Sequence, residues 1–186
     1  MLLTESQQMV RDTMRSFAGK RLAPFAAEWD RNHRFPREAL GELAALGACG
    51  MVVPERYGGA GLDYVSLAVA LEEIAAGDGA TSTILSVQNS VVCGPLLAFG
   101  TEAQKELFLE SLASGAMLGC FCLSEPHVGS DAGAITTRAE RAACRPPEEP
   151  VLLQTGAPVR RHCGGLGRGR TRGPALLRVR DVARVH

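Results

Sequence analysis

The sequence has no apolar stretch long enough to span a bilayer, because charged residues, Gly or Pro interrupt its longest apolar runs. Its start also lacks the basic segment and following apolar run of a secretory signal peptide. The six Cys residues show no metal-ligand spacing, which favours buried thiols in a reducing compartment over a metal site. These absences predict a cytoplasmic protein without a membrane span or a metal centre.

The formal net charge of zero hides two regions of opposite charge. Residues 1–140 contain 10 basic and 17 acidic residues, a formal charge of −7, whereas residues 141–186 contain 10 Arg and 3 acidic residues, a formal charge of +7. From about Cys144 onward there is no Lys, Ile, Phe, Tyr, Trp, Asn, Met or Ser. Because so few large apolar residues remain to form a core, we expect residues 142–186 to be mostly disordered.

Two explanations of this basic tail stay open. It is a functional segment in which a run such as Gly167–Arg170 binds nucleic acid, or it is an out-of-frame reading of a GC-rich gene. The abrupt change of composition favours the second explanation.

The residues before the tail predict about five helices. Apolar spacing and helix-boundary residues place them at residues 4–31 with a break at Pro24, at 37–46, from 64 onward, at 80–98 and from 102 onward. Asp63 is expected to cap the third helix, and Thr101 with Gln104 to form a capping box on the last. The Pro- and Gly-rich segment 53–61 predicts a chain reversal between helices. In the third helix we expect Tyr64, Leu67, Ala68, Leu71, Ile74 and Ala75 to form the apolar face.

Two sets of polar residues on these helices are candidates for a functional role. Glu72 and Glu73 are adjacent and do not face each other on a helix, so a solvated or salt-bridged role is expected and not a catalytic pair. Gln88, Asn89 and Ser90 lie in a predominantly apolar helix and need hydrogen-bond partners. Those partners are either backbone groups or a ligand.

The most informative segment runs from the apolar residues Met117–Leu123 into Ser-Glu-Pro-His-Val-Gly-Ser-Asp. This pattern predicts a strand that stops abruptly, because Pro126 fixes φ and lacks an N–H donor. Gly129 has no Cβ and lets a ligand approach the backbone closely. Ser124 and Ser130 supply hydroxyl groups. An ordinary strand-to-turn junction has similar residues, so the motif alone is moderately specific.

The segment resembles the flavin-contacting signature of the acyl-CoA dehydrogenases. Four further blocks resemble landmarks of that family in the same order: residues 53–63, 71–75, 86–90 and 99–105. The resemblance covers about residues 2–141 and is closest to the short- and branched-chain members. It departs at Val128, where the family usually has a small residue and where a β-branched side chain disfavours positive φ.

The resemblance implies a mainly α fold in three parts. An orthogonal helical domain is expected at 1–115, the first strand and turn of a truncated β-domain at 116–141, and the tail at 142–186. It implies FAD as cofactor, held in a partial site by Phe121, Cys122, Leu123, Ser124, Glu125, Pro126, His127, Val128, Gly129 and Ser130. Ser130 would also contact the substrate.

The implied reaction is FAD-dependent α,β-dehydrogenation of an acyl-CoA thioester, in fatty acid or branched-chain amino acid catabolism. No Glu here matches the family's catalytic base, which we expect beyond residue 186, so the chain as written is expected to be inactive. A full-length parent would pass electrons to an electron-transfer flavoprotein and form a homo-oligomer. The alternative is a non-catalytic helical binding or scaffold module whose basic tail meets nucleic acid or a protein partner.

Overall fold

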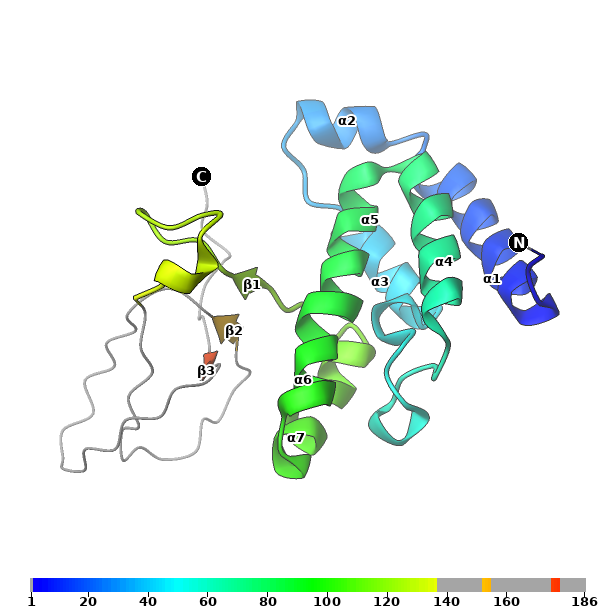
Figure 1. Cartoon of the computed structure of the whole chain (residues 1–186). Coiled ribbons are helices and arrows are strands. Elements are labelled where there is room, and N and C mark those ends of the chain that lie inside the picture. Colours follow the sequence, from blue (N-terminus) through cyan, green and yellow to red (C-terminus); the bar gives the residue numbers. More distant parts are fainter. Residues whose placement is uncertain (1, 137–151, 155–174, 178–186) are drawn as a thin grey trace. The chain divides into compact units, whose positions relative to one another are not determined.

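The computed structural model describes residues 2–136, 152–154 and 175–177, which divide into two units, Met1–Leu118 and Gly119–His186 (Figure 1). The described part is mainly helical, as the sequence predicts. The first unit contains the helices α1 (Glu5–Phe17), η1 (Ala18–Leu22), α2 (Ala26–Arg31), α3 (Arg37–Ala45), η2 (Ala48–Gly50), η3 (Glu55–Tyr57), α4 (Tyr64–Gly77), α5 (Gly79–Ser86), η4 (Val87–Cys93), α6 (Gly94–Phe99) and α7 (Glu102–Ala113).

The helices begin and end where the boundary residues predict. The side chain of Asp63 accepts a hydrogen bond from Ser66 N and caps α4. Thr101 and Gln104 form the expected capping box on α7. The first helical segment ends at Leu22, two residues before Pro24, and α2 starts at Ala26. Gly47 after α3 has a φ of 78°.

The segment between η2 and α4 is the predicted chain reversal. Gly58 and Gly61 have φ values of 78° and 61°, which other residues rarely adopt. Gly59 lies against the preceding chain, because a Cβ on it would fall 2.0 Å from the carbonyl oxygen of Val53. These glycines let the chain fold back upon itself.

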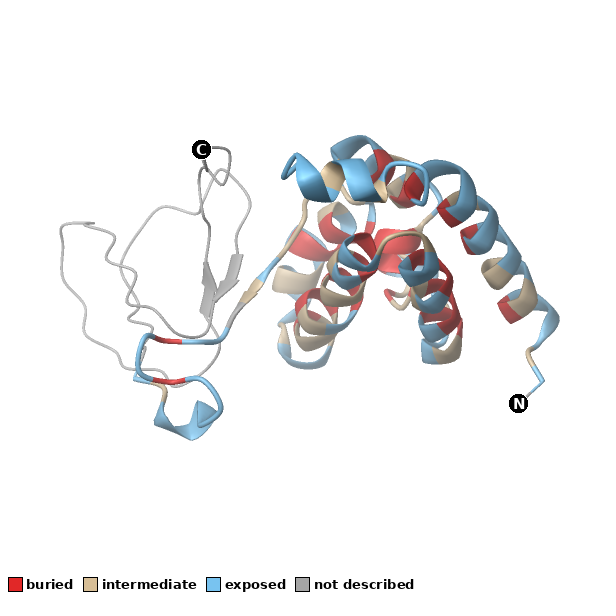
Figure 2. Ribbon diagram, turned by 90° about the horizontal axis from the view of Figure 1, so that it is seen from above, coloured by how far each residue is buried: buried red, intermediate tan, exposed pale blue. Residues whose placement is uncertain are grey.

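The core lies on the inner faces of the helices (Figure 2). Buried side chains from α1, α3, α4 and α5 contribute Met14, Leu43, Leu67, Ile74 and Leu85, with Cys49 and Met51 from η2 and the turn after it. The expected face of α4 was partly wrong. Tyr64 is 66% exposed, and Ala68 and Ala75 are exposed, whereas Val69, Ala70 and Glu73 are buried.

Glu73 is held by Arg15 of α1. The Arg15 guanidinium donates two hydrogen bonds to the carboxylate, from Nε at 2.9 Å and from Nη2 at 2.6 Å. The Glu73 carboxylate raises the pKa of Arg15 through these bonds and through its charge. The salt-bridged role expected for this carboxylate is therefore confirmed, although its burial was not anticipated.

The stretch formed by α5, η4 and α6 corrects one expectation. From Gly79 to Phe99 it spans 21 residues, and an 18-residue window within it has a mean hydropathy of 1.3, so that by length and composition it is enough to cross a membrane. We expected no such stretch from the sequence. Its polar side chains Gln88 and Asn89 bind carbonyl groups of neighbouring segments, as in a central helix of a helical domain.

The second unit contains β1 (Phe121–Cys122), η5 (Ala132–Ala134), β2 (Leu152–Gln154) and β3 (Ala175–Leu177). β1 pairs with β2 in parallel, with Phe121 opposite Leu153, and β2 pairs with β3 in antiparallel. β1 is shorter than the expected strand. Apart from β2 and β3, the tail lies outside the described residues, and its disorder stays a prediction.

Candidate functional site

The ten residues predicted to contact a cofactor form β1 and the turn that follows it. Phe121 and Cys122 are the strand. Glu125 and Val128 then pair through both backbone hydrogen bonds, Glu125 N to Val128 O at 2.9 Å and Val128 N to Glu125 O at 3.1 Å. Pro126 and His127 form the tip of this tight turn, so the strand stops as predicted.

The carboxylate of Glu125 holds the turn from inside. Its Oε2 accepts hydrogen bonds from Thr136 N at 3.1 Å and from Thr136 Oγ1 at 3.0 Å. His127 Nε2 lies 3.3 Å from the same oxygen. The Glu125 side chain is 3% exposed, whereas that of His127 is 58% exposed. A buried carboxylate needs such partners, and these fix the turn against the segment after η5.

Thr136 is a residue that the sequence analysis missed. It lies eleven positions after Glu125, and nothing in that spacing signals a contact. The Ser-Glu-Pro motif identified the carboxylate but not the residue that binds it.

Four of the remaining predicted residues are exposed to solvent. Ser124, Gly129 and Ser130 are exposed, and Leu123 is 39% exposed. Val128, in contrast, is 4% exposed and supports the turn from within. A Cβ added to Gly129 would meet nothing within 4 Å, so the backbone is open to an approaching group there.

The departure from the family pattern at Val128 causes no backbone strain. Among the described residues His33 alone combines a side chain with a positive φ. Val128 therefore keeps an ordinary backbone conformation and buries its side chain.

The exposed residues of this segment include one apolar side chain, Leu123, and the hydroxyl groups of Ser124 and Ser130. Ligand sites typically pair apolar surface with a few polar groups of this kind, so the chemistry of these residues is compatible with a bound flavin. Two cavities in the helical unit, of about 160 and 170 Å³, are lined by none of the ten residues.

The polar residues of η4 find backbone partners. Gln88 Nε2 donates to Leu112 O at 2.8 Å and to Met117 O at 3.0 Å. Asn89 Nδ2 donates to Ala48 O at 2.8 Å and to Leu85 O at 3.0 Å. Ser90 Oγ donates to Ser86 O. The hydrogen-bond partners of these side chains were expected to be either backbone groups or a ligand, and the structure shows backbone groups.

The cysteines differ in their surroundings. Burial raises the pKa of Cys49 to about 11 and that of Cys93 to about 12, so both are neutral thiols at physiological pH. These two behave as the expected small apolar core residues. Cys120, just before β1, is exposed, which corrects the expectation of burial for that residue.

Comparison with known proteins agrees with the motifs. The family model described as the N-terminal domain of acyl-CoA dehydrogenase matches residues 4–116. The chain is 49% identical over 137 residues to the mitochondrial short-chain specific acyl-CoA dehydrogenase of Bos taurus, covering 74% of this chain and 33% of that protein. It is 45% identical over 139 residues to an acyl-CoA dehydrogenase of Bacillus subtilis, covering 75% and 37%.

A solved structure gives the same relation. Butyryl-CoA dehydrogenase of Megasphaera elsdenii matches with a TM-score of 0.70 and 39% identity, over 74% of this chain and 37% of that one. The chain thus spans about a third of the length of the curated relatives it matches. With the family model matching more than half of its residues and the fold agreeing with a solved member, the chain belongs to the acyl-CoA dehydrogenase family.

Proposed function

We propose that this protein contributes the helical domain and one side of the flavin site to an FAD-dependent acyl-CoA dehydrogenase. The observation that carries the proposal is the turn after β1. Backbone bonds between Glu125 and Val128 fix the turn, and Leu123, Ser124 and Ser130 around it are exposed. An apolar side chain and two hydroxyl groups suit a flat ring with a polar edge.

Each predicted residue has a role in this proposal. Leu123 contacts the face of the ring, and Ser124 and Ser130 donate hydrogen bonds to its polar edge. Gly129 lets the backbone approach the ring, and Ser130 also contacts the acyl-CoA. Phe121, Cys122, Pro126 and His127 contribute contacts from the strand and the tip. FAD supplies the hydride-accepting chemistry when bound.

We assign the catalytic base to none of the carboxylates in this sequence. Glu125 is committed to Thr136 and His127, and Glu73 to Arg15, so neither is available to remove a proton from a substrate. Because no Glu of this sequence matches the catalytic base of the family, we expect the chain by itself to lack dehydrogenase activity. We propose an electron-transfer flavoprotein as the electron acceptor of the complete enzyme and a homo-oligomer as its assembly.

A hybrid protein tests this function. Residues 4–136 of this chain replace the corresponding residues of the Bacillus subtilis acyl-CoA dehydrogenase, to which the chain is 45% identical. We expect the hybrid to reduce an artificial electron acceptor with a short-chain acyl-CoA, and the chain alone to do so at no measurable rate.

Two results would count against the proposal. A folded hybrid without activity would favour the alternative, a helical binding module. Activity of the chain alone would show that its own carboxylates include the base.

A further inference from the structure

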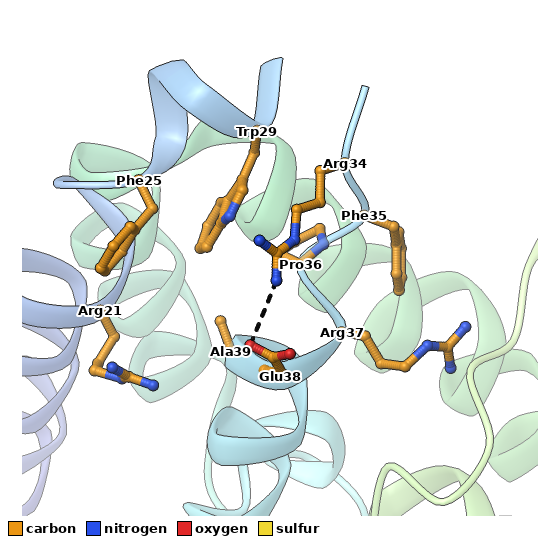
Figure 3. Close-up of a pocket in the computed structure, with 9 residues that line it drawn as sticks. All are labelled: Arg21, Phe25, Trp29, Arg34, Phe35, Pro36, Arg37, Glu38 and Ala39. Carbon is orange, nitrogen blue, oxygen red and sulfur yellow. Dashed lines mark ion pairs between the residues drawn. The ribbon is translucent and has the colours of Figure 1, made fainter. Parts of the chain in front are cut away.

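The helical unit contains a cavity that none of the ten residues predicted to contact a flavin lines. It has a volume of about 160 Å³ and opens between α2, the segment that follows it and the start of α3 (Figure 3). Its lining combines arginines with aromatic residues: Arg21, Phe25, Trp29, Arg34, Phe35, Pro36, Arg37, Glu38 and Ala39. Neither the flavin nor the acyl-CoA proposal uses these side chains.

The aromatic part of the lining offers a flat surface. The rings of Phe25 and Trp29 are stacked, with centroids 5.9 Å apart and an interplanar angle of 23°. The Trp29 ring points into the cavity from above (Figure 3). Phe25 is 39% exposed and Phe35 46% exposed, so both rings leave apolar surface uncovered in the described structure. Uncovered aromatic surface around a cavity is typical of a binding site.

The charged part of the lining is positive. Arg21 is neutralised by Glu42, which it binds through both Nε and Nη2. Arg34 Nη2 lies 3.6 Å from Glu38 Oε2, and because both side chains are more than half exposed this pair contributes little free energy. Arg37 lies over the Phe35 ring at 5.6 Å and belongs to none of the ion pairs of the described residues. Two guanidinium groups are thus weakly engaged or without a carboxylate.

The cavity is open to solvent on one side, and its volume is comparable with that of one aromatic ring. A buried apolar cavity of about 150 Å³ is known to accept one benzene molecule. A cavity of 160 Å³ therefore has room for a single six-membered ring. Guanidinium groups bind carboxylate and phosphate through paired hydrogen bonds.

We propose that this cavity binds a small aryl oxyanion, a single aromatic ring that carries a carboxylate or a phosphate. The ring lies against Trp29 and Phe25. The oxyanion accepts hydrogen bonds from the Arg34 guanidinium and thereby competes with Glu38 for it. Arg37 attracts the oxyanion from the rim of the cavity.

Trp29 is the single Trp of the chain, so its fluorescence reports on the cavity directly. Phenyl phosphate, inorganic phosphate and phenol are titrated at constant ionic strength, with excitation at the red edge of indole absorption. We expect phenyl phosphate to bind at least about tenfold more tightly than phosphate or phenol, since it combines both kinds of contact. Equal affinities for phenol and phenyl phosphate, or no saturable change, would overturn the proposal.

Three variants separate binding from folding. Arg34→Gln should lower the affinity for phenyl phosphate about tenfold, which is the usual effect of losing a charge-assisted hydrogen bond. Glu38→Gln removes the competing carboxylate and should strengthen binding up to about fivefold. Arg31→Gln alters an exposed neighbour on α2 that does not line the cavity and should leave the affinity unchanged.

Circular dichroism shows whether each variant keeps its helices. A Glu38→Gln protein that is folded and binds more weakly than the parent would contradict the arrangement, as would an effect of Arg31→Gln equal to that of Arg34→Gln.

Discussion

At the residue scale, the buried side chain of Asn89 links two segments of the helical unit by hydrogen bonds. It is fully buried, and its Nδ2 joins the carbonyl of Ala48 in η2 to that of Leu85 in α5. Its Oδ1 is buried as well and has no hydrogen-bond partner among the described residues. Because its two donated bonds satisfy buried carbonyl groups, replacing Asn89 should lower the free energy of unfolding.

Asn89→Ala should therefore destabilise the protein by about 2–4 kcal/mol, because it leaves buried carbonyls unpaired and opens a cavity. Chemical denaturation followed by circular dichroism measures this loss. Ser90→Ala on the same helix is the matched control. Its hydroxyl is exposed and bonds within the helix, so its effect should stay within about 0.5 kcal/mol. Equal effects of the two substitutions would contradict the assignment.

Asp63 gives a pH dependence. Hydrogen bonds from Ser66, with a further one from Gln7, lower the pKa of its carboxyl group below the ordinary 3.8. A carboxyl group whose pKa is lower in the folded than in the unfolded protein stabilises the fold at pH values above its unfolded-state pKa. That stabilisation is lost as the pH falls through its folded-state pKa.

Asp63→Asn keeps a good capping residue but no longer titrates. Its melting temperature should fall less than that of the parent between about pH 5 and pH 3. A parallel decline in the Asp63→Asn and parent proteins would exclude the carboxyl group as a source of acid sensitivity.

At the element scale, the glycines differ sharply in what they tolerate. Gly59→Ala would place a Cβ 2.4 Å from the Val53 Cβ in the reversal before α4, and we expect a loss of about 3 kcal/mol or more. Gly41→Ala lies on an exposed face of α3, where a Cβ meets nothing within 4 Å, and should raise the stability by about 0.5–1 kcal/mol. Denaturant midpoints measure both changes. A tolerated Gly59→Ala would show that the reversal is looser than described.

Elements whose signals are local could be predicted from the sequence. Thr101 and Asp63 act through bonds three residues away, and Gly58 and Gly61 act through their own backbone angles. The Ser-Glu-Pro turn was also read correctly, because Pro126 acts on its own position.

Features that depend on distant contacts could not be predicted. α4 is apolar on nearly every side, so periodicity did not identify its buried face, and packing placed Val69 and Glu73 inside and Tyr64 outside. The bond of Glu125 to Thr136 and the tryptophan-lined cavity likewise arise from the folded chain.

At the scale of the whole molecule, the chain forms two units that contain different features. The helical unit has side-chain caps on α1, α4, α5 and α7 and a buried core, and the Arg15–Glu73 ion pair joins α1 to α4. The second unit contains the turn after β1, which the bonds between Glu125 and Val128 fix and around which Leu123, Ser124 and Ser130 are exposed. We propose that these exposed residues seat a flavin.

Flavin absorbance of the purified hybrid protein tests that claim most directly. We predict a yellow hybrid with about one FAD per chain, and a Leu123→Asp hybrid that folds but loses most of its flavin, because the charge faces the ring. Ser114→Asp, on an exposed position after α7, should retain the flavin. A folded hybrid without FAD, or a Leu123→Asp hybrid with its full complement, would contradict the account.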